Sequence, residues 1–548
     1  MRVKLNTKVS FLWIYVLLFF LVFNGYAQTS KEAVDLSQLE TYFVEAMGNW
    51  KIPGMAVAIV KDGKVVLAKG FGVKEYSKAD KVDEMTLFAI ASNTKAFTAA
   101  ALAILVDEGK IKWDDRVCEY LPYFRLYDPY VTEEMRIRDL LCHRCGLGTF
   151  SGDLLWYETP YTAKEVIKRA RYLKPAFGFR GGYGYSNIMF MAAGEIIPAV
   201  TGEKWEDFVK ECIFTPLGMR VTHVGTNELK KHRNVATPHY VTSEGETFTI
   251  SYTSSDVIAS AGGINSNVSE MSRWMIMLLN NGIFDNTRIL SEDQIGEMWT
   301  PQTVIPASKS TKELFPTTHF NSYGLGWGLS DYHGYKIVSH SGGLDGMISR
   351  VAMVPEIKLG LVVLTNSINS LPPALAYKII DTYLGVLPKD WSQIYLERDR
   401  KALEEDKERI ARIKEKILIT EKTIPTPRLE DFTGCYGGPM YGDAVVSSEK
   451  DNLVLNFLPS PVFISDLTHM YYDTFLLKLR NKFSFIPHGI GTVQFLRDKD
   501  GKVIEMEVDI PNHDFFFTEL EFKKKNVCSD PGMAEVGNAQ SRLPGFGD

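Results

Sequence analysis

Long apolar runs are scarce in this chain of 548 residues. One run, from Phe11 to Phe23, is shorter than the ~20 residues that a bilayer span needs. Basic residues precede it and small residues follow it, which is typical of a secretory signal peptide. We therefore expect a signal peptide over residues 1–27, cleavage before Gln28, no membrane span after its removal, and a secreted or periplasmic protein. An uncleaved anchor is the alternative.

An excess of positive charge is also lacking. The formal net charge is −6, whereas a protein that binds nucleic acid usually carries a basic face. The apolar share of 45% and the charged share of 23% are those of an ordinary soluble globular protein. We expect no nucleic-acid partner.

Cysteine is sparse, since six residues in a chain of this length are too few for a disulfide framework. Cys142 and Cys145 form a C-x-x-C motif, but no second ligand pair accompanies it, so the motif is weak support for a zinc or redox site. We expect a buried pair of small residues there, with a local disulfide as an alternative, and neither metal nor cofactor. The G-x-S-x-G motif of α/β-hydrolases and the H-E-x-x-H motif of zinc enzymes are absent.

The first part of the chain mixes helical and strand patterns. Residues 54–68 predict a hairpin around Asp62-Gly63, because Asp-Gly between two apolar runs favours a tight turn. An amphipathic helix is predicted at 29–50, apolar helices at 96–106, 188–200 and 268–280, and antiparallel strands at 335–339 and 349–365. This order predicts an α+β fold, with an antiparallel sheet flanked by helices over residues 29–385.

The composition changes after about residue 390. Residues 386–427 are dense in Lys, Arg and Glu with apolar residues at helical spacing, which predicts a charged helical linker. Residues 428–523 hold short alternating strands separated by turn signals, which is typical of a small all-β barrel or sandwich. Residues 524–548 predict a disordered tail.

Ser92 and Lys95 form the first motif that carries chemistry. A serine hydroxyl is a weak nucleophile unless a base takes its proton. At the start of a helix a side chain three residues on lies on the same face, so Lys95 can reach Ser92. The simpler interpretation is a serine N-cap with a solvated lysine. The same spacing recurs at Ser447 and Lys450, where we assign it no function.

Two further motifs follow. Tyr185-Ser186-Asn187 precedes a buried helix, and a tyrosine can act there as general base and later acid while Asn187 orients a substrate carbonyl and Lys95. His340-Ser341-Gly342-Gly343 ends a strand whose backbone can lie along a substrate. The N–H groups of Gly343 and Ser92 would then form an oxyanion hole. A core tyrosine, a structural histidine and a tight turn are the simpler interpretations.

The order of these three motifs resembles that of the serine β-lactamase and D-Ala-D-Ala peptidase superfamily. The resemblance extends over about residues 35–385 and includes Arg138-Asp139-Leu140-Leu141 and the stretch from Tyr323 to Gly328. The branch it is most similar to is that of class C β-lactamases, esterases and D-aminopeptidases. Residues 428–523 resemble a lipocalin-like barrel that follows the catalytic domain in some of these hydrolases.

The resemblance implies a role for each motif. Ser92 would be the nucleophile, with Lys95 as its partner and Tyr185 as general base, the last two forming a coupled pair. Asn187, His340, Gly342 and Gly343 would bind substrate. His340 stands where many relatives have a lysine that binds a substrate carboxylate, so fixed positive charge is weaker there near neutral pH.

These features predict an exported serine hydrolase that acts through a Ser92 acyl-enzyme on short peptides or amides, including those with D-amino acids. The alternatives are an esterase for small acyl esters, a weak β-lactamase, and an inactive sensor that binds muropeptides. The expected partner is a small peptide, amide or ester substrate, and a homo-oligomer is compatible with the linker and barrel.

Overall fold

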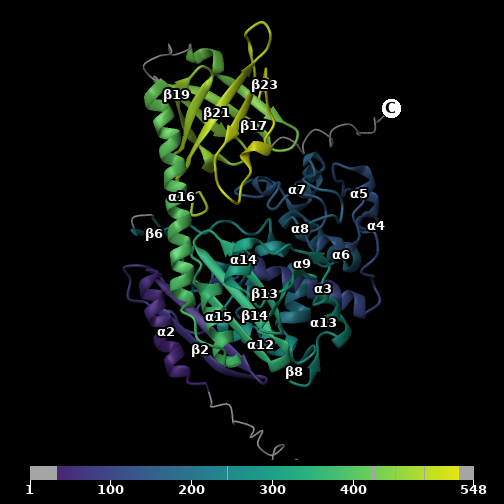
Figure 1. The fold of residues 1–548 in the computed structure, drawn as a ribbon. Helices are drawn as coiled ribbons and strands as arrows, with labels where there is room; N and C mark the ends of the chain where they lie inside the picture. The colour runs from purple at the N-terminus through teal and green to yellow at the C-terminus, as the bar shows by residue number, and fades with distance from the viewer. Residues whose placement is uncertain (1–33, 243–244, 421–427, 451, 487, 530–548) are drawn as a thin grey trace, which may run out of the picture. The chain divides into compact units, whose positions relative to one another are not determined.

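The computed structural model describes residues 34–242, 245–420, 428–450, 452–486 and 488–529 (Figure 1). The predicted signal peptide therefore lies outside the described residues. The chain divides into a unit of residues 1–41 and a unit of residues 42–548, and helix α2 (Leu36–Asn49) begins in the first and ends in the second. No helix within the described ranges is long and apolar enough to cross a membrane.

After α2 the chain forms a large antiparallel sheet. Its strand order is β10-β11-β12-β13-β14-β15-β1-β2, and each neighbouring pair is antiparallel. Its strands are β1 (Gly54–Lys61), β2 (Lys64–Gly72), β10 (Thr303–Val304), β11 (Asn321–Tyr323), β12 (Gly328–Tyr332), β13 (Tyr335–Leu344), β14 (Met347–Val354) and β15 (Leu359–Thr365). The predicted hairpin is the β1–β2 pair.

Apolar helices pack on this sheet and on one another, as the sequence pattern indicates. They include α3 (Thr94–Asp107), α8 (Asn187–Thr201), α12 (Val268–Leu279) and α15 (Leu371–Leu384). Both α12 and α15 contact β15, all of whose residues are buried, so helices cover the sheet here. The α+β prediction of an antiparallel sheet flanked by helices is confirmed.

Shorter elements complete this region. Its short helices are α4 (Val117–Tyr120), α5 (Pro129–Glu134), α6 (Ile137–Leu140), α7 (Ala163–Arg169), α9 (Trp205–Val209), α10 (Thr226–Leu229), α11 (Ala259–Gly262), α13 (Glu292–Met298) and α14 (Lys309–Leu314). A three-stranded sheet joins β3 (Phe88–Ala89), β7 (Ile264–Ser266) and β4 (His223–Val224). Two small hairpins are β5 (His239–Val241) with β6 (Thr247–Thr249), and β8 (Ile283–Phe284) with β9 (Thr287–Arg288).

Helix α16 (Trp391–Thr420) follows within the predicted charged linker. Its start is anchored, because the indole of Trp391 is buried and donates to Asp381, which also accepts from the hydroxyl of Tyr332. The helix packs against α15 and also contacts strand β19 of the C-terminal region (Figure 1).

The C-terminal region is a closed eight-stranded antiparallel barrel, as the alternating pattern indicates. Its strands are β16 (Gly434–Gly438), β17 (Gly442–Glu449), β18 (Asn452–Phe457), β19 (Ser465–Tyr471), β20 (Thr474–Leu479), β21 (Ile490–Arg497), β22 (Val503–Asp509) and β23 (Phe522–Lys525). Pairing of β16 with β23 closes it. The chain is therefore ordered beyond residue 523, where the sequence predicted the tail to begin, and residues 530–548 lie outside the described ranges.

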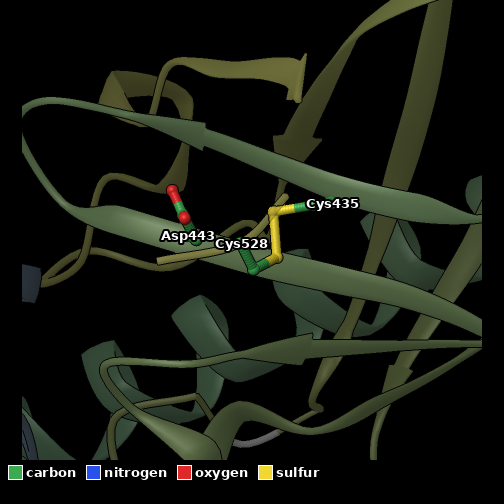
Figure 2. A group of neighbouring side chains, drawn as sticks. All are labelled: Cys435, Asp443 and Cys528. Carbon is green, nitrogen blue, oxygen red and sulfur yellow. A yellow bond between two sulfur atoms is a disulfide. The ribbon is translucent and has the colours of Figure 1, made fainter. Parts of the chain in front are cut away.

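A disulfide that the sequence did not predict joins Cys435 on β16 to Cys528 after β23 (Figure 2). Asp443 lies beside it, and two thiols with a carboxylate would suit a metal. Both sulfurs are used by the disulfide, however, and the Asp443 carboxylate accepts from the ammonium of Lys525 at 2.7 Å and the backbone N–H of Ser529. This disulfide thus links the first strand of the barrel to the segment that follows its last strand.

The cysteines of the C-x-x-C motif are not bonded to each other. Cys142 and Cys145 are buried free thiols, and Cys118 and Cys212 are free thiols that are partly exposed. Burial raises the pKa of Cys142 to about 12, so its thiol is unreactive at neutral pH. The motif is therefore a buried pair of small residues, and its two cysteines do not form a local disulfide.

Thiol counting tests this arrangement. We expect an alkylating reagent to modify four cysteines in the denatured, unreduced protein and all six after reduction, with Cys435 and Cys528 newly labelled. Replacing both by serine should lower the free energy of unfolding of the barrel by about 2–4 kcal/mol. Mass spectrometry gives the count and thermal unfolding gives the loss. Six labelled cysteines without reduction would contradict the disulfide.

Candidate active site

Ser92 lies in a tight turn between strand β3 and helix α3. The turn is a short 3₁₀ segment, Ala91–Asn93, and Ala91 has a φ of 46°, in the left-handed region that a non-glycine residue seldom adopts. Ser349 of β14 braces the turn, because its hydroxyl donates to the carbonyl of Ile90 at 2.6 Å and accepts from the amide of Asn93 at 2.8 Å. The surrounding structure thus holds a strained backbone that presents Ser92 at the start of α3.

Lys95 follows one turn later and is buried. Its Nζ is 3.2 Å from Ser92 Oγ, 2.6 Å from Asn187 Oδ1 and 2.8 Å from the carbonyl oxygen of Ala261. It also lies 4.8 Å from the ring centre of Tyr185. The interpretation of Lys95 as a solvated first-turn residue is therefore wrong, and Ser92 makes no capping contact with α3, whose N-cap is Asn93.

Burial controls the charge of this lysine. Removal from water lowers the pKa of Lys95 to about 7, while the Asp153 carboxyl acts in the opposite direction. The amine is therefore neutral in a substantial fraction of molecules at neutral pH. A neutral amine at this position donates to Asn187 and Ala261, and its lone pair is left for the Ser92 hydroxyl.

Asp153 is a member of the site that the sequence analysis missed. Its carboxylate accepts from Asn187 Nδ2 at 2.6 Å, which fixes the amide so that Asn187 Oδ1 faces Lys95. Burial raises the pKa of Asp153 to about 7, although the hydrogen bond from Asn187 and the charge of Lys95 act in the opposite direction. Asp153 follows no recognisable motif, so only its position in space reveals it.

Tyr185 packs over the same lysine from the loop before α8. Its ring lies 4.1 Å from that of His143 and 5.3 Å from that of Phe150, measured between ring centres. Burial raises the pKa of Tyr185 well above its usual value, and a hydrogen bond with the Ser92 side chain opposes this only in part. The phenol therefore keeps its proton and is a donor at neutral pH.

His340 is neutral and fully engaged. Its Nδ1 lies 2.6 Å from the carbonyl oxygen of Ser341 and must donate to it, so its Nε2 accepts from the hydroxyl of Tyr323 at 2.7 Å. Burial and the nearby charge of Lys95 lower the pKa of His340 to about 3. The side chain carries no positive charge for a substrate carboxylate. A cation is instead available from Arg350 of β14, which donates to the hydroxyls of Ser339 and Ser341.

The strand that carries His340 has a free edge. Strand β14 pairs with β13 along Gly342 and Gly343 on one side, whereas on the other side β12 pairs only as far as Ser339 and no described strand continues from there. Gly342 packs against the nucleophile turn so closely that an added Cβ would lie 2.2 Å from the carbonyl oxygen of Ile90 and 2.9 Å from the N–H of Ser92. Only glycine fits there, and an extended substrate could add to this edge.

One cavity of about 440 Å³ brings the predicted residues together. Ser92, Tyr185, Asn187, His340, Gly342 and Gly343 all line it. Lys95 lies behind Ser92, within hydrogen-bonding distance of it. Aromatic rings form much of the remaining wall, and the barrel contributes Phe485, Asp514 and Phe515. No residue of the barrel was among the site residues predicted from the sequence.

Comparison with known proteins identifies the family. The chain matches the β-lactamase family over residues 39–382 and a domain of unknown function (DUF3471) over residues 420–524. The chain belongs to the β-lactamase family, a family of serine hydrolases.

Among similar proteins is an unguisins hydrolase of Aspergillus campestris, 29% identical over 434 residues, which are 75% of this chain and 77% of that protein. Another, from Aspergillus violaceofuscus, is 31% identical over 378 residues, which are 64% of this chain and 66% of the relative. An octameric penicillin-binding protein homologue from Pyrococcus abyssi has a similar fold, with a TM-score of 0.59 and 24% identity over 89% of this chain and all of that chain.

The pKa of Lys95 predicts how acylation depends on pH. If neutral Lys95 accepts the proton of Ser92, the acylation rate should fall as pH drops through about 7, where the lysine becomes protonated, by about ten-fold per pH unit below that point. Stopped-flow labelling of Ser92 with a neutral fluorophosphonate measures this rate. A rate that stays constant between pH 5 and 8 would contradict the role of Lys95.

Proposed function

We propose that this protein is an exported serine hydrolase that cleaves short peptides or amides, including those with D-residues, through an acyl-enzyme on Ser92. The observation that carries the proposal is the set of contacts of Lys95. Two of the three positions around its Nζ are occupied by Asn187 Oδ1 and the Ala261 carbonyl, so the third faces Ser92 Oγ at 3.2 Å. A buried amine held in this way is placed to exchange a proton with Ser92.

In the proposed first step, neutral Lys95 takes the Ser92 proton as Oγ bonds to the substrate carbonyl carbon. The resulting oxyanion is stabilised by the N–H groups of Ser92 and Gly343. This geometry is supported by the close packing of Gly342 on the Ser92 turn, which brings the two backbones together. The strained turn at Ala91 fixes the position of the nucleophile before substrate arrives.

Tyr185 is the proposed acid for the leaving group. Its phenol is protonated, and its ring lies over Lys95 Nζ, so it can give its proton to the departing nitrogen and be reprotonated from Lys95. The C–N bond then breaks and leaves an acyl ester on Ser92. Water, deprotonated by the same pair, hydrolyses that ester in the second half of the reaction. In this mechanism Lys95 takes the first proton, whereas the family resemblance alone suggested Tyr185 as the general base.

The hydrolase activity is supported by the relatives named above, both of which are hydrolases of unguisins. Export is supported by the Cys435–Cys528 disulfide, because disulfides persist in oxidising compartments. An esterase is the second candidate, since the same acyl-enzyme route would cleave small esters. A strong β-lactamase is disfavoured because His340, which stands where many relatives have a carboxylate-binding lysine, is neutral, and the guanidinium of Arg350 nearby is already hydrogen-bonded to Ser339 and Ser341.

The nucleophile is tested by a matched pair of serines. We expect Ser92→Ala to abolish labelling by a fluorophosphonate, because it removes the oxygen that bonds to phosphorus. Ser447→Ala should label as the unaltered protein does, since Ser447 has the same S-x-x-K spacing but is exposed on barrel strand β17. In-gel fluorescence measures both. Undiminished labelling of Ser92→Ala would overturn the proposed mechanism, and so would no labelling of the unaltered protein.

A substrate panel separates peptidase from esterase. We expect turnover of D- and L-amino acid amides to be abolished by Ser92→Ala and by Lys95→Met, which keeps the volume of the buried side chain and removes the base. A loss of kcat of at least about 10³-fold is expected for each, given the effect of removing an activated nucleophile. Turnover of nitrophenyl esters alone would favour the esterase. Tight muropeptide binding without turnover would favour the sensor.

A further inference from the structure

The barrel places one loop in the wall of the active-site cavity. This loop follows β22 and is wound around the side chain of Asn512. The amide of Asn512 donates to the carbonyls of Ile510 and Phe515 and accepts from the N–H groups of Asp514 and Phe515, at 2.6–2.9 Å. The loop therefore has a fixed conformation that presents Asp514 and Phe515 to the cavity.

The end of the loop is docked beside the catalytic lysine network. Glu519 accepts from the Ser151 hydroxyl at 2.5 Å and from the N–H of Gly152 at 2.8 Å. Gly152 immediately precedes Asp153, which orients Asn187. A second contact joins the Ser460 hydroxyl of the barrel to the carbonyl of Tyr157 at 3.0 Å. These contacts hold the barrel against the site without any help from Asp514.

Asp514 is a carboxylate without a partner. No hydrogen bond or ion pair from the described residues reaches its side-chain oxygens, although it is half-buried in the cavity wall. Burial, with the charge of Asp345 adding to it and that of His513 opposing, raises the pKa of Asp514 to about 6, so the group is ionised at neutral pH. A half-buried anion that serves no structural contact and faces a catalytic cavity indicates a ligand of opposite charge.

The wall around Asp514 suits an organic cation. The rings of Trp156, Tyr157 and Phe515 line the same cavity, and that of Tyr157 lies 4.6 Å from that of Phe515 and 5.7 Å from that of Trp156, measured between ring centres. Aromatic faces attract ammonium groups, most strongly where water is excluded. A carboxylate beside several rings is a combination that favours an amine over a neutral or anionic group.

The wall of the cavity carries charges of both signs. Asp514 of the barrel and Arg350 of strand β14 both line it. A substrate bound at Ser92 therefore meets a carboxylate and a guanidinium in the same cavity. An ammonium on the substrate is attracted to the first and repelled by the second.

We propose that Asp514, supplied by the C-terminal barrel, binds a free ammonium group on the acyl part of the substrate, so that the enzyme selects peptides or amides with an unblocked amino group. This inference rests on the proposed Ser92 acyl-enzyme. It makes the barrel a part of the substrate site, with Trp156, Tyr157 and Phe515 as the apolar surround of the ammonium.

The test uses a pair of ligands that needs no knowledge of the natural substrate. 1-Aminoethylboronic acid and its N-acetyl derivative, each as both enantiomers, accept a bond from Ser92 Oγ at boron and differ in the charge at nitrogen. Their affinities are measured by protection of the full-length protein from fluorophosphonate labelling. We expect the free amine to bind more tightly than the N-acetyl ligand. Asp514→Asn should lower the affinity for the free amine by about ten-fold or more and leave the affinity for the N-acetyl ligand unchanged.

Two control variants make the result specific. Asp509→Asn makes the same chemical change on the exposed surface of β22, outside the cavity, and should keep the full preference. Asp514→Glu keeps the charge and should keep more of the preference than Asp514→Asn. The labelling rate of each variant by the neutral fluorophosphonate alone reports whether the site is intact.

The outcomes separate the two proposals. Failure of the unaltered protein to label would overturn the Ser92 mechanism, and this inference with it. Normal labelling with equal affinity for the two ligands would overturn the role of Asp514 alone. The same conclusion would follow if the Asp514→Asn variant labels normally and its affinity falls equally for both ligands, or falls for neither. Selective loss of the free amine, with retention in Asp509→Asn, would establish Asp514 as the ammonium site.

Discussion

The burial of the Lys95 amine is the constraint on which the site depends. An ammonium removed from water is costly, by roughly several kcal/mol, unless each of its protons finds an acceptor. Here Asn187 and the Ala261 carbonyl supply two, and Ser92 occupies the remaining direction. Because that environment nearly balances the charged and neutral forms, the lysine can exchange a proton at neutral pH. Asp153 maintains the balance from a distance, since it fixes which end of the Asn187 amide faces the lysine.

The need of the buried Lys95 amine for hydrogen-bonding partners also explains how distant parts of the chain are arranged. The acceptors of Lys95 come from the start of α8 and the end of α11, while the turn that holds Ser92 is braced by Ser349 of β14. Three elements far apart in sequence must therefore meet at one point. The antiparallel sheet and the buried face of α3 provide the rigid frame for this meeting, because α3 is buried along most of its length.

The sequence was sufficient for the parts of the site that repeat a local pattern. The spacing of Ser92 and Lys95, the Tyr185–Asn187 stretch and the His340–Gly343 strand end each have a short signature, and all reach one cavity. Asp153, Arg350 and Asp514 have none, since a single charged residue looks the same in a surface loop as in a cavity. The Cys435–Cys528 pair was equally hidden, because a separation of 93 residues gives no indication of pairing.

The charge of His340 could not be predicted for a related reason. A histidine in place of a lysine suggests a weaker, pH-dependent cation, but the group's state is set by its partners rather than by its type. The Tyr323 hydroxyl and the Ser341 carbonyl occupy both ring nitrogens. Burial and the nearby charge of Lys95 favour the neutral form and outweigh the opposite effect of the Ser341 carbonyl. Charge selection in the cavity then falls to groups outside the three motifs, Arg350 on the sheet and Asp514 on the barrel. On the proposal that Asp514 binds the substrate ammonium, the substrate of a catalytic centre built from three short motifs is selected in part by a residue that takes no part in bond breaking and that the second domain supplies.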